Sequence, residues 1–222
     1  MSSLEYIDAT IIPIVELLVV PAVTIYYFVN RMTQKTLFFT LFLVTYSFSD
    51  IINLIDGEAL YEPIYYICNG MYILAYMFLI AYILKSLNAK LLIKKFLFQI
   101  VVLTILSVYL FSVLFDIVDP NVYESDIVNF VRFTEHSFNL VLLVLLGISF
   151  LNYLDKGSKK ALVLFTGCVA ITFSELLLIG YYYLADYKML NYFAILLNFS
   201  AFLLFYYQSE IRVSDNKTNV FA

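Results

Sequence analysis

The stretch that decides the fold class of this chain runs from Thr36 to Ile55 and reads TLFFTLFLVTYSFSDIINLI. About 20 mainly apolar residues are enough to cross the roughly 30 Å hydrocarbon layer of a bilayer as a helix. Within this stretch, residues 48–53 form a polar kernel around Asp50. A carboxyl group inside such a helix is costly unless it is neutral, paired or beside water. The stretch therefore predicts a transmembrane helix that carries a functional carboxyl.

The same arrangement returns later in the chain. Phe173, Ser174 and Glu175 lie within a second apolar run, residues 161–184. Glu175 stands as many positions into this run as Asp50 stands into the first. We interpret the two carboxyls as facing each other across one intramembrane site.

Further residues suggest an internal repeat. The runs that precede the two kernels contain Glu16 and Glu135, and the runs that follow them contain Asn69 and Asn198. The pattern predicts three helices, one connecting helix and three more helices, a parallel repeat of the kind found in some transporters. Chance similarity at a few positions is the competing explanation.

Composition places the whole chain in the membrane class. Hydrophobic residues make up 63% of its 222 residues and charged residues 14%, and the mean hydropathy is +0.90. These values exclude an ordinary soluble domain, and no basic stripe with interleaved aromatics points to nucleic acid.

We predict an all-α polytopic bundle over residues 1–208, with a short cytoplasmic tail at 209–222. Seven transmembrane helices, or at most eight, are expected, and the seven apolar runs are 11–29, 36–55, 64–84, 96–115, 127–150, 161–184 and 189–207.

The charges between these runs predict an orientation. The connections after the first, third and fifth runs, together with the tail, hold eleven lysines and arginines, whereas the opposite side holds only Lys188. Because basic residues concentrate on the cytoplasmic side, the N-terminus is expected outside and the C-terminus inside. The first run has no basic residue before it, so it is expected to be retained rather than cleaved as a signal. A bacterial inner membrane is the expected location.

Polar side chains gather in the outer half of the predicted spans, whereas the inner half is almost wholly apolar. Four of them, Arg132, Glu135, His136 and Asn139, have the spacing that places residues on one helix face. A pocket open to the outer face is expected, with Asp50 and Glu175 as acid–base groups. The supporting residues are Glu16, Asn53, Asn69, Arg132, Glu135, His136, Asn139, Ser174 and Asn198. Blander alternatives are an Arg132–Glu135 ion pair, a packing role for His136 and serines bonded to their own helices. No metal or cofactor is expected.

Several motifs resemble the YhhN family of lysoplasmalogenases. They are Tyr46-Ser47-Phe48-Ser49-Asp50, the helix from Asn69-Gly70 to Tyr82, and the segment from Ala170 to Glu175. Glu175 stands where the family has an aspartate. The resemblance implies hydrolysis of the vinyl-ether bond of a lysophospholipid, with Asp50 and Glu175 as the catalytic carboxyls and a membrane lipid as substrate. The alternatives are a small-solute or proton-coupled transporter and a non-enzymatic membrane sensor or scaffold. A polar path through the inner half would favour the transporter.

Overall fold

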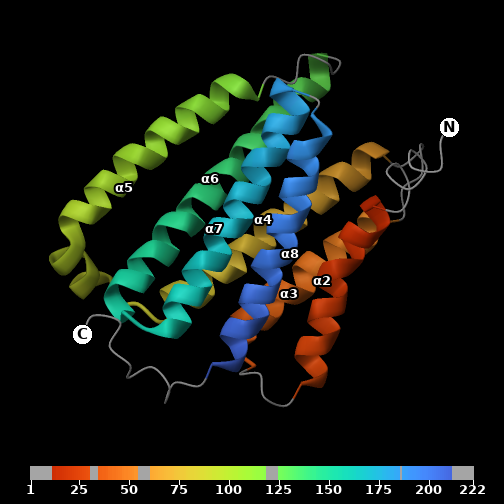
Figure 1. The fold of residues 1–222 in the computed structure, drawn as a ribbon. Helices are drawn as coiled ribbons and strands as arrows, with labels where there is room; N and C mark the ends of the chain where they lie inside the picture. Colours follow the sequence, from red (N-terminus) through yellow and green to blue (C-terminus); the bar gives the residue numbers. More distant parts are fainter. Residues whose placement is uncertain (1–11, 31–34, 55–60, 119–124, 186, 212–222) are drawn as a thin grey trace.

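The computed structural model describes residues 12–30, 35–54, 61–118, 125–185 and 187–211. In these ranges the chain is all α-helical and contains no strand (Figure 1). The seven α-helices are α2 (Ile12–Val29), α3 (Leu37–Asn53), α4 (Tyr61–Leu84), α5 (Ala89–Ile117), α6 (Ser125–Lys156), α7 (Lys159–Ile179) and α8 (Lys188–Glu210). A π-helical turn, Gly180–Leu184, continues α7.

Each predicted apolar run corresponds to one helix. By length and composition, α4, α5, α6, α8 and the combined helix of α7 with its π-helical turn can cross a membrane, whereas the apolar parts of α2 and α3 are shorter. The protein is therefore a membrane protein by this criterion, and the count of seven spans stays a prediction. The helix α5 begins before the predicted run because Ala89 to Lys95 form a helical segment that kinks at Phe96. The helix α8 ends at Glu210, two residues beyond the predicted bundle boundary.

Six helices form a closed ring. In the order α2, α3, α4, α6, α7 and α8, each packs against the next, and α8 packs against α2. The helices α3 and α7 are therefore opposite each other, separated by two helices on either side. Among the described helices, α5 packs mainly against α6 and lies outside the ring (Figure 1).

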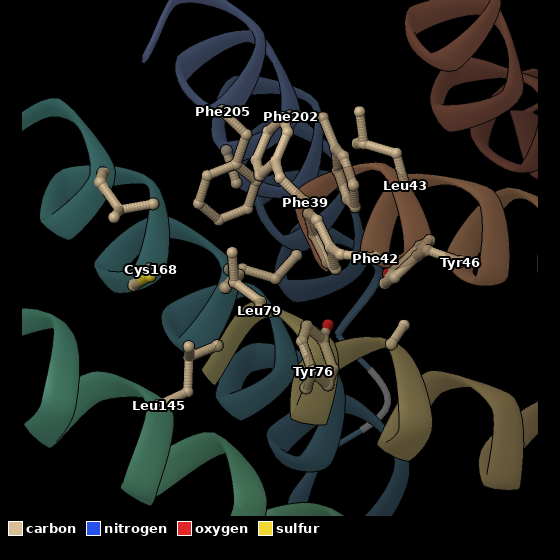
Figure 2. Packing of buried hydrophobic residues seen from close by; sticks show 14 of the residues in the cluster. Phe39, Phe42, Leu43, Tyr46, Tyr76, Leu79, Leu145, Cys168, Phe202 and Phe205 are labelled. Atoms are coloured by element: carbon tan, nitrogen blue, oxygen red, sulfur yellow. The ribbon is translucent and has the colours of Figure 1, made fainter. Parts of the chain in front are cut away.

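Aromatic side chains fill the centre of this ring. Phe42 of α3 stacks on Phe202 of α8 with ring centroids 5.8 Å apart, and Tyr46 meets the same Phe202 at 4.7 Å. Tyr76 of α4 and Cys168 of α7 reach the same cluster (Figure 2). Because lipid is as apolar as these rings, such close packing, rather than exclusion of water, is what holds membrane helices together.

The buried positions of α3 and α7 coincide when residue numbers are shifted by 125. Phe39, Phe42, Leu43, Tyr46, Ser47 and Ser49 correspond in this way to Leu164, Gly167, Cys168, Ile171, Thr172 and Ser174, and all twelve are buried. In the same register Asp50 corresponds to Glu175. The two kernels therefore occupy equivalent places in two similarly packed helices.

The helices that follow show the same correspondence with a shift of 126. Cys68, Ala75, Tyr76, Leu79 and Ile83 of α4 correspond to Ala194, Ala201, Phe202, Phe205 and Ser209 of α8, and all ten are buried. The contacts of α2 with α3 and α8 match those of α6 with α7 and α4. We refer to α2–α4 and α6–α8 as the two halves; their correspondence in burial agrees with the predicted repeat around α5, which stays a prediction.

Two of the matches expected from sequence are wrong in this register. A shift of 125 pairs Val20, Thr24 and Tyr27 of α2 with Leu145, Ser149 and Asn152 of α6, and all six are buried. Glu16 then corresponds to Val141, not to Glu135. Likewise Asn198 corresponds to Tyr72, not to Asn69. Similar residue types in the same pair of helices suggested these matches, but they stand at different depths.

The ends of the bundle differ in charge. The C-terminal ends of α2, α4, α6 and α8 lie at one end (Figure 1). At this end Lys156 Nζ donates to the carbonyl of Ser86 at 2.7 Å, and Lys160 Nζ donates to that of Ile211 at 3.2 Å. Of the lysines in the described ranges, only Lys188 lies at the opposite end. We refer to the lysine-rich end as the inner end, following the predicted orientation.

We predict that Gly167→Ala destabilises the protein. The added Cβ would lie 2.6 Å from Cε1 of the fully buried Phe205, which has little room to move. The expected loss is about 1–3 kcal/mol of unfolding free energy, as for other overpacked cores. Thermal unfolding in detergent measures it. Gly147→Ala is the control because nothing lies within 4 Å of its added Cβ; equal melting temperatures for the two variants would contradict the packing argument.

Candidate functional site

Asp50 lies in the last turn of α3 and is 4% exposed. Its Oδ1 accepts a hydrogen bond from the Tyr72 hydroxyl of α4 at 2.7 Å. The same hydroxyl accepts a bond from Asn53 Nδ2 at 3.2 Å. Asp50 and Asn53, both predicted site residues, are therefore joined through a tyrosine that the sequence analysis did not single out.

Glu175 lies on α7, on the opposite side of the ring, and is partly buried. Its Oε1 accepts a hydrogen bond from the Tyr76 hydroxyl of α4 at 3.2 Å. Tyr76 lies one helical turn after Tyr72, so a single face of α4 presents hydroxyls to both carboxyls.

Tyr46 lies beside the two tyrosines that bind the carboxyls. Its ring centroid is 4.7 Å from that of Tyr72 and 5.9 Å from that of Tyr76, and its hydroxyl accepts a hydrogen bond from Asn198 Nδ2 of α8 at 3.3 Å. The structure thus brings Asp50, Glu175, Asn53 and Asn198 together around the tyrosine hydroxyls of residues 46, 72 and 76. We call these seven residues the carboxyl–tyrosine site.

The two serines beside the carboxyls connect neighbouring helices. Ser49 Oγ donates to the Cys68 carbonyl of α4 at 3.0 Å, and Ser174 Oγ donates to the Ala194 carbonyl of α8 at 2.7 Å. The alternative that these serines bond within their own helices is wrong for both. The two bonds are equivalent in the two halves, so each serine fixes the depth of its neighbouring carboxyl against the next helix.

The polar face of α6 is a second polar region. Glu135 accepts a hydrogen bond from the Tyr65 hydroxyl of α4. His136 stacks on Phe115 of α5 with ring centroids 4.3 Å apart. Asn139 is 1% exposed, and neither of its amide atoms has a hydrogen-bond partner within the protein. Arg132 is partly buried on the same helix and interacts electrostatically with His136.

The remaining two predicted site residues are Asn69 and Glu16. Asn69 Nδ2 donates to the Tyr65 carbonyl of its own helix at 2.9 Å, which is a local bond. Glu16 belongs to α2, but its side chain lies outside the described residues.

Further polar groups pair near the inner end of the bundle, at or just beyond the inner ends of the predicted spans. Gln208 Nε2 of α8 donates to the Tyr82 hydroxyl of α4 at 2.7 Å, and Gln208 is 1% exposed. Closer to the inner end, Asn30 Nδ2 donates to the Tyr206 hydroxyl and to Glu210 Oε1. Hydropathy could not reveal these groups because tyrosine and glutamine near the end of a span are also typical of the lipid interface.

The tyrosines are the functional residues that sequence reasoning missed. Tyrosines near span ends anchor helices at the interface, and this explanation sufficed for most of them. Tyr46, Tyr72 and Tyr76 stand near the middle of their apolar runs, far from either interface, and that position was the available signal. A buried tyrosine in the membrane needs a partner for its hydroxyl.

Comparison with known proteins adds no relative: no family model, no curated protein and no solved structure matches the chain. The resemblance to the YhhN family therefore rests on the sequence motifs alone and stays a prediction.

We predict that Ser49→Ala and Ser174→Ala destabilise the protein to a similar extent. Each removes an equivalent hydrogen bond between helices, which within a membrane is worth about 0.6–1.7 kcal/mol. Ser200→Ala is the matched control, because Ser200 donates to Leu196 of its own helix at 2.8 Å. Thermal unfolding in detergent would show whether only the first two variants lose stability; a loss in the control alone would refute the equivalence of the two kernels.

Proposed function

We propose that the protein is a proton-coupled membrane transporter of a small organic cation, and that Asp50 and Glu175 bind the proton and the cation in turn. The observation that carries the proposal is the placement of one carboxyl at the same position in each of two similarly packed halves. Repeats related in this way are typical of transporters, whose sites lie where the repeats meet. The carboxyl–tyrosine site lies at such a meeting place, because α3 and α7 are opposite members of the ring.

The chemistry of the carboxyl–tyrosine site favours a cation. Two carboxyls supply negative charge, and three aromatic rings lie close together beside them. The ring centroid of Tyr46 is 4.7 Å from that of Tyr72 and 4.7 Å from that of Phe202. Aromatic faces attract cations, most strongly when water is excluded. A carboxyl group that holds a proton cannot also pair with a cation. Competition between the two therefore couples cation movement to proton movement in the opposite direction.

The polar groups near the inner end support transport further. Tyr82 and Gln208 occupy equivalent positions in the two halves and hydrogen-bond to each other. This pair therefore lies on the pseudo-two-fold axis that relates the two halves. Asn30 and Glu210 lie beyond this pair. Between the pair and the carboxyl–tyrosine site, the buried rings of Phe42, Phe202 and Phe205 pack together. A solute therefore meets hydrogen-bonding partners on both sides of an aromatic layer, and it crosses that layer only when the helices move apart.

The second candidate is the lysoplasmalogenase-like hydrolase that the YhhN resemblance implies. It is favoured by the difference between the two carboxyls, since Asp50 is buried with a 2.7 Å bond and Glu175 is partly exposed with a 3.2 Å bond. Different surroundings are what an acid and a base require. One protonated carboxyl would protonate the enol-ether carbon, and the other carboxylate would stabilise the oxocarbenium ion and direct water to it. The products would be a fatty aldehyde and a glycerophospho-base.

We predict cation–proton exchange by purified protein in proteoliposomes. With a pH dye inside the vesicles, choline or ethanolamine added outside is expected to raise the internal pH as protons leave. Asp50→Asn and Glu175→Gln should each slow this response by about tenfold or more, because losing a hydrogen bond to a charged group costs about 1.5–3 kcal/mol and a factor of ten corresponds to about 1.4 kcal/mol. Asp116→Asn is the control, since Asp116 is exposed at the end of α5.

The same preparations separate the two candidates. Release of aldehyde from a lysoplasmalogen by the parent, lost in both carboxyl variants, together with no exchange, would replace the transporter by the hydrolase. Neither activity from well-folded protein would leave the sensor or scaffold role.

A further inference from the structure

We propose that Asn139 and His136 of α6 form an outer polar subsite, through which water and small polar solutes reach the carboxyl–tyrosine site. The inference rests on the proposed transport function and adds one further binding position on the outer side of its site.

The first observation is the unpaired amide of Asn139. Both of its amide atoms are buried, and neither has a hydrogen-bond partner within the protein. Each buried polar atom without a partner is unfavourable, and in a membrane no alternative solvent reduces this cost. A leucine at this position would avoid the cost, so the amide is best explained by a polar molecule that it binds.

The second observation concerns His136, which lies three residues before Asn139 on the same face of α6. Both ring nitrogens are buried and have no hydrogen-bond partner within the protein. The ring is held from one side by Phe115 of α5, which leaves the nitrogens at its edge as the groups able to bind. An amide and an imidazole together both donate and accept hydrogen bonds, which suits water, hydroxyl and ammonium groups.

The depth of these residues places them outward of the carboxyls. Leu143 packs in one cluster with Ile179 of α7, which fixes the relative depth of the two helices. Asn139 lies one turn outward from Leu143, and Glu175 lies one turn inward from Ile179, so the two differ in depth by about 12 Å at 1.5 Å per residue. Asn139 therefore lies level with the π-helical turn that begins at Gly180. Turns of this kind interrupt regular helices and are frequent at functional sites.

The charges around the subsite nearly balance. Glu135 precedes His136 and is bonded by Tyr65, while Arg132 lies one turn further outward. Inward from the subsite stand Asp50 and Glu175, with no basic side chain among the residues of the carboxyl–tyrosine site. A solute that enters past Asn139 therefore moves into an increasingly negative field, which favours cations over anions.

Reaction of introduced cysteines with water-soluble reagents tests the subsite without knowledge of the natural solute. In a background with Cys68→Ala and Cys168→Ala, the variants Asn139→Cys and His136→Cys are treated in sealed vesicles with a cationic or an anionic methanethiosulfonate. The thiolate attacks the reagent, forms a mixed disulfide and releases methanesulfinate, and mass spectrometry counts the product. Leu143→Cys is the matched control, one turn inward in an apolar cluster.

We expect both site variants to react and the control to remain unmodified. The cationic reagent should react about tenfold faster than the anionic one, as focusing by buried charge commonly produces, and Asp50→Asn with Glu175→Gln should abolish this preference. Gel filtration confirms that each variant is folded. No reaction at either position in folded protein, or equal rates for the two reagents, would overturn the proposal. Reaction with the expected preference but without cation–proton exchange would leave the subsite standing and refute the transporter instead.

Discussion

A polar side chain inside a bilayer must find its partner within the protein, and this constraint explains most of the structure. Asp50 cannot face lipid, so α3 turns this residue towards α4, where Tyr72 donates to it. Once that face is fixed, the opposite face of α3 meets lipid, and Phe48 is accordingly 54% exposed. Phe173, its equivalent in α7, is 53% exposed. One hydrogen-bonding requirement therefore sets the rotation of each kernel helix.

The two halves of the bundle satisfy this constraint in the same way. In each half a serine beside the carboxyl bonds the carbonyl of the next helix, which joins α3 to α4 and α7 to α8. In the first half the preceding helix adds a hydroxyl, since Thr24 Oγ1 lies 2.6 Å from Ser47 Oγ. The equivalent Ser149 of the second half donates to Leu146 of its own helix at 2.9 Å instead. Lys35 and Lys160 also correspond, each just before or at the start of its kernel helix. The bond from the kernel serine to the next helix is thus the one that both halves share.

The sequence predicted the helices and the kernels well, because both depend on local patterns. Apolar runs gave the seven helices to within a few residues, apart from the ends of α5 and α6, where polar and basic residues continue the helix beyond the hydrocarbon. The pairing of Asp50 with Glu175 followed from equal positions in two runs. The partners of the carboxyls could not be predicted, because Tyr72 and Tyr76 are assigned only when the rotation of α4 against α3 and α7 is known. The mistaken pairing of Glu16 with Glu135 had the same origin, since residue type without burial does not define register.

The two halves are alike in packing but not in chemistry, and this difference bears on how they could move. Tyr46, Tyr72 and Tyr76 of the first half correspond to Ile171, Asn198 and Phe202 of the second, so most hydroxyls of the carboxyl–tyrosine site come from one side. Two of the hydrogen bonds that cross between the halves there, Tyr76 to Glu175 and Asn198 to Tyr46, measure 3.2 and 3.3 Å. Bonds within the first half at this site range from 2.7 Å for Tyr72 to Asp50 to 3.2 Å for Asn53 to Tyr72. A rocking motion of one half against the other would break the crossing contacts at the carboxyls and leave the bonds within each half in place. Binding of a proton or a cation at Glu175 competes for the same oxygen that Tyr76 uses, which is how occupancy of the site would bias that motion.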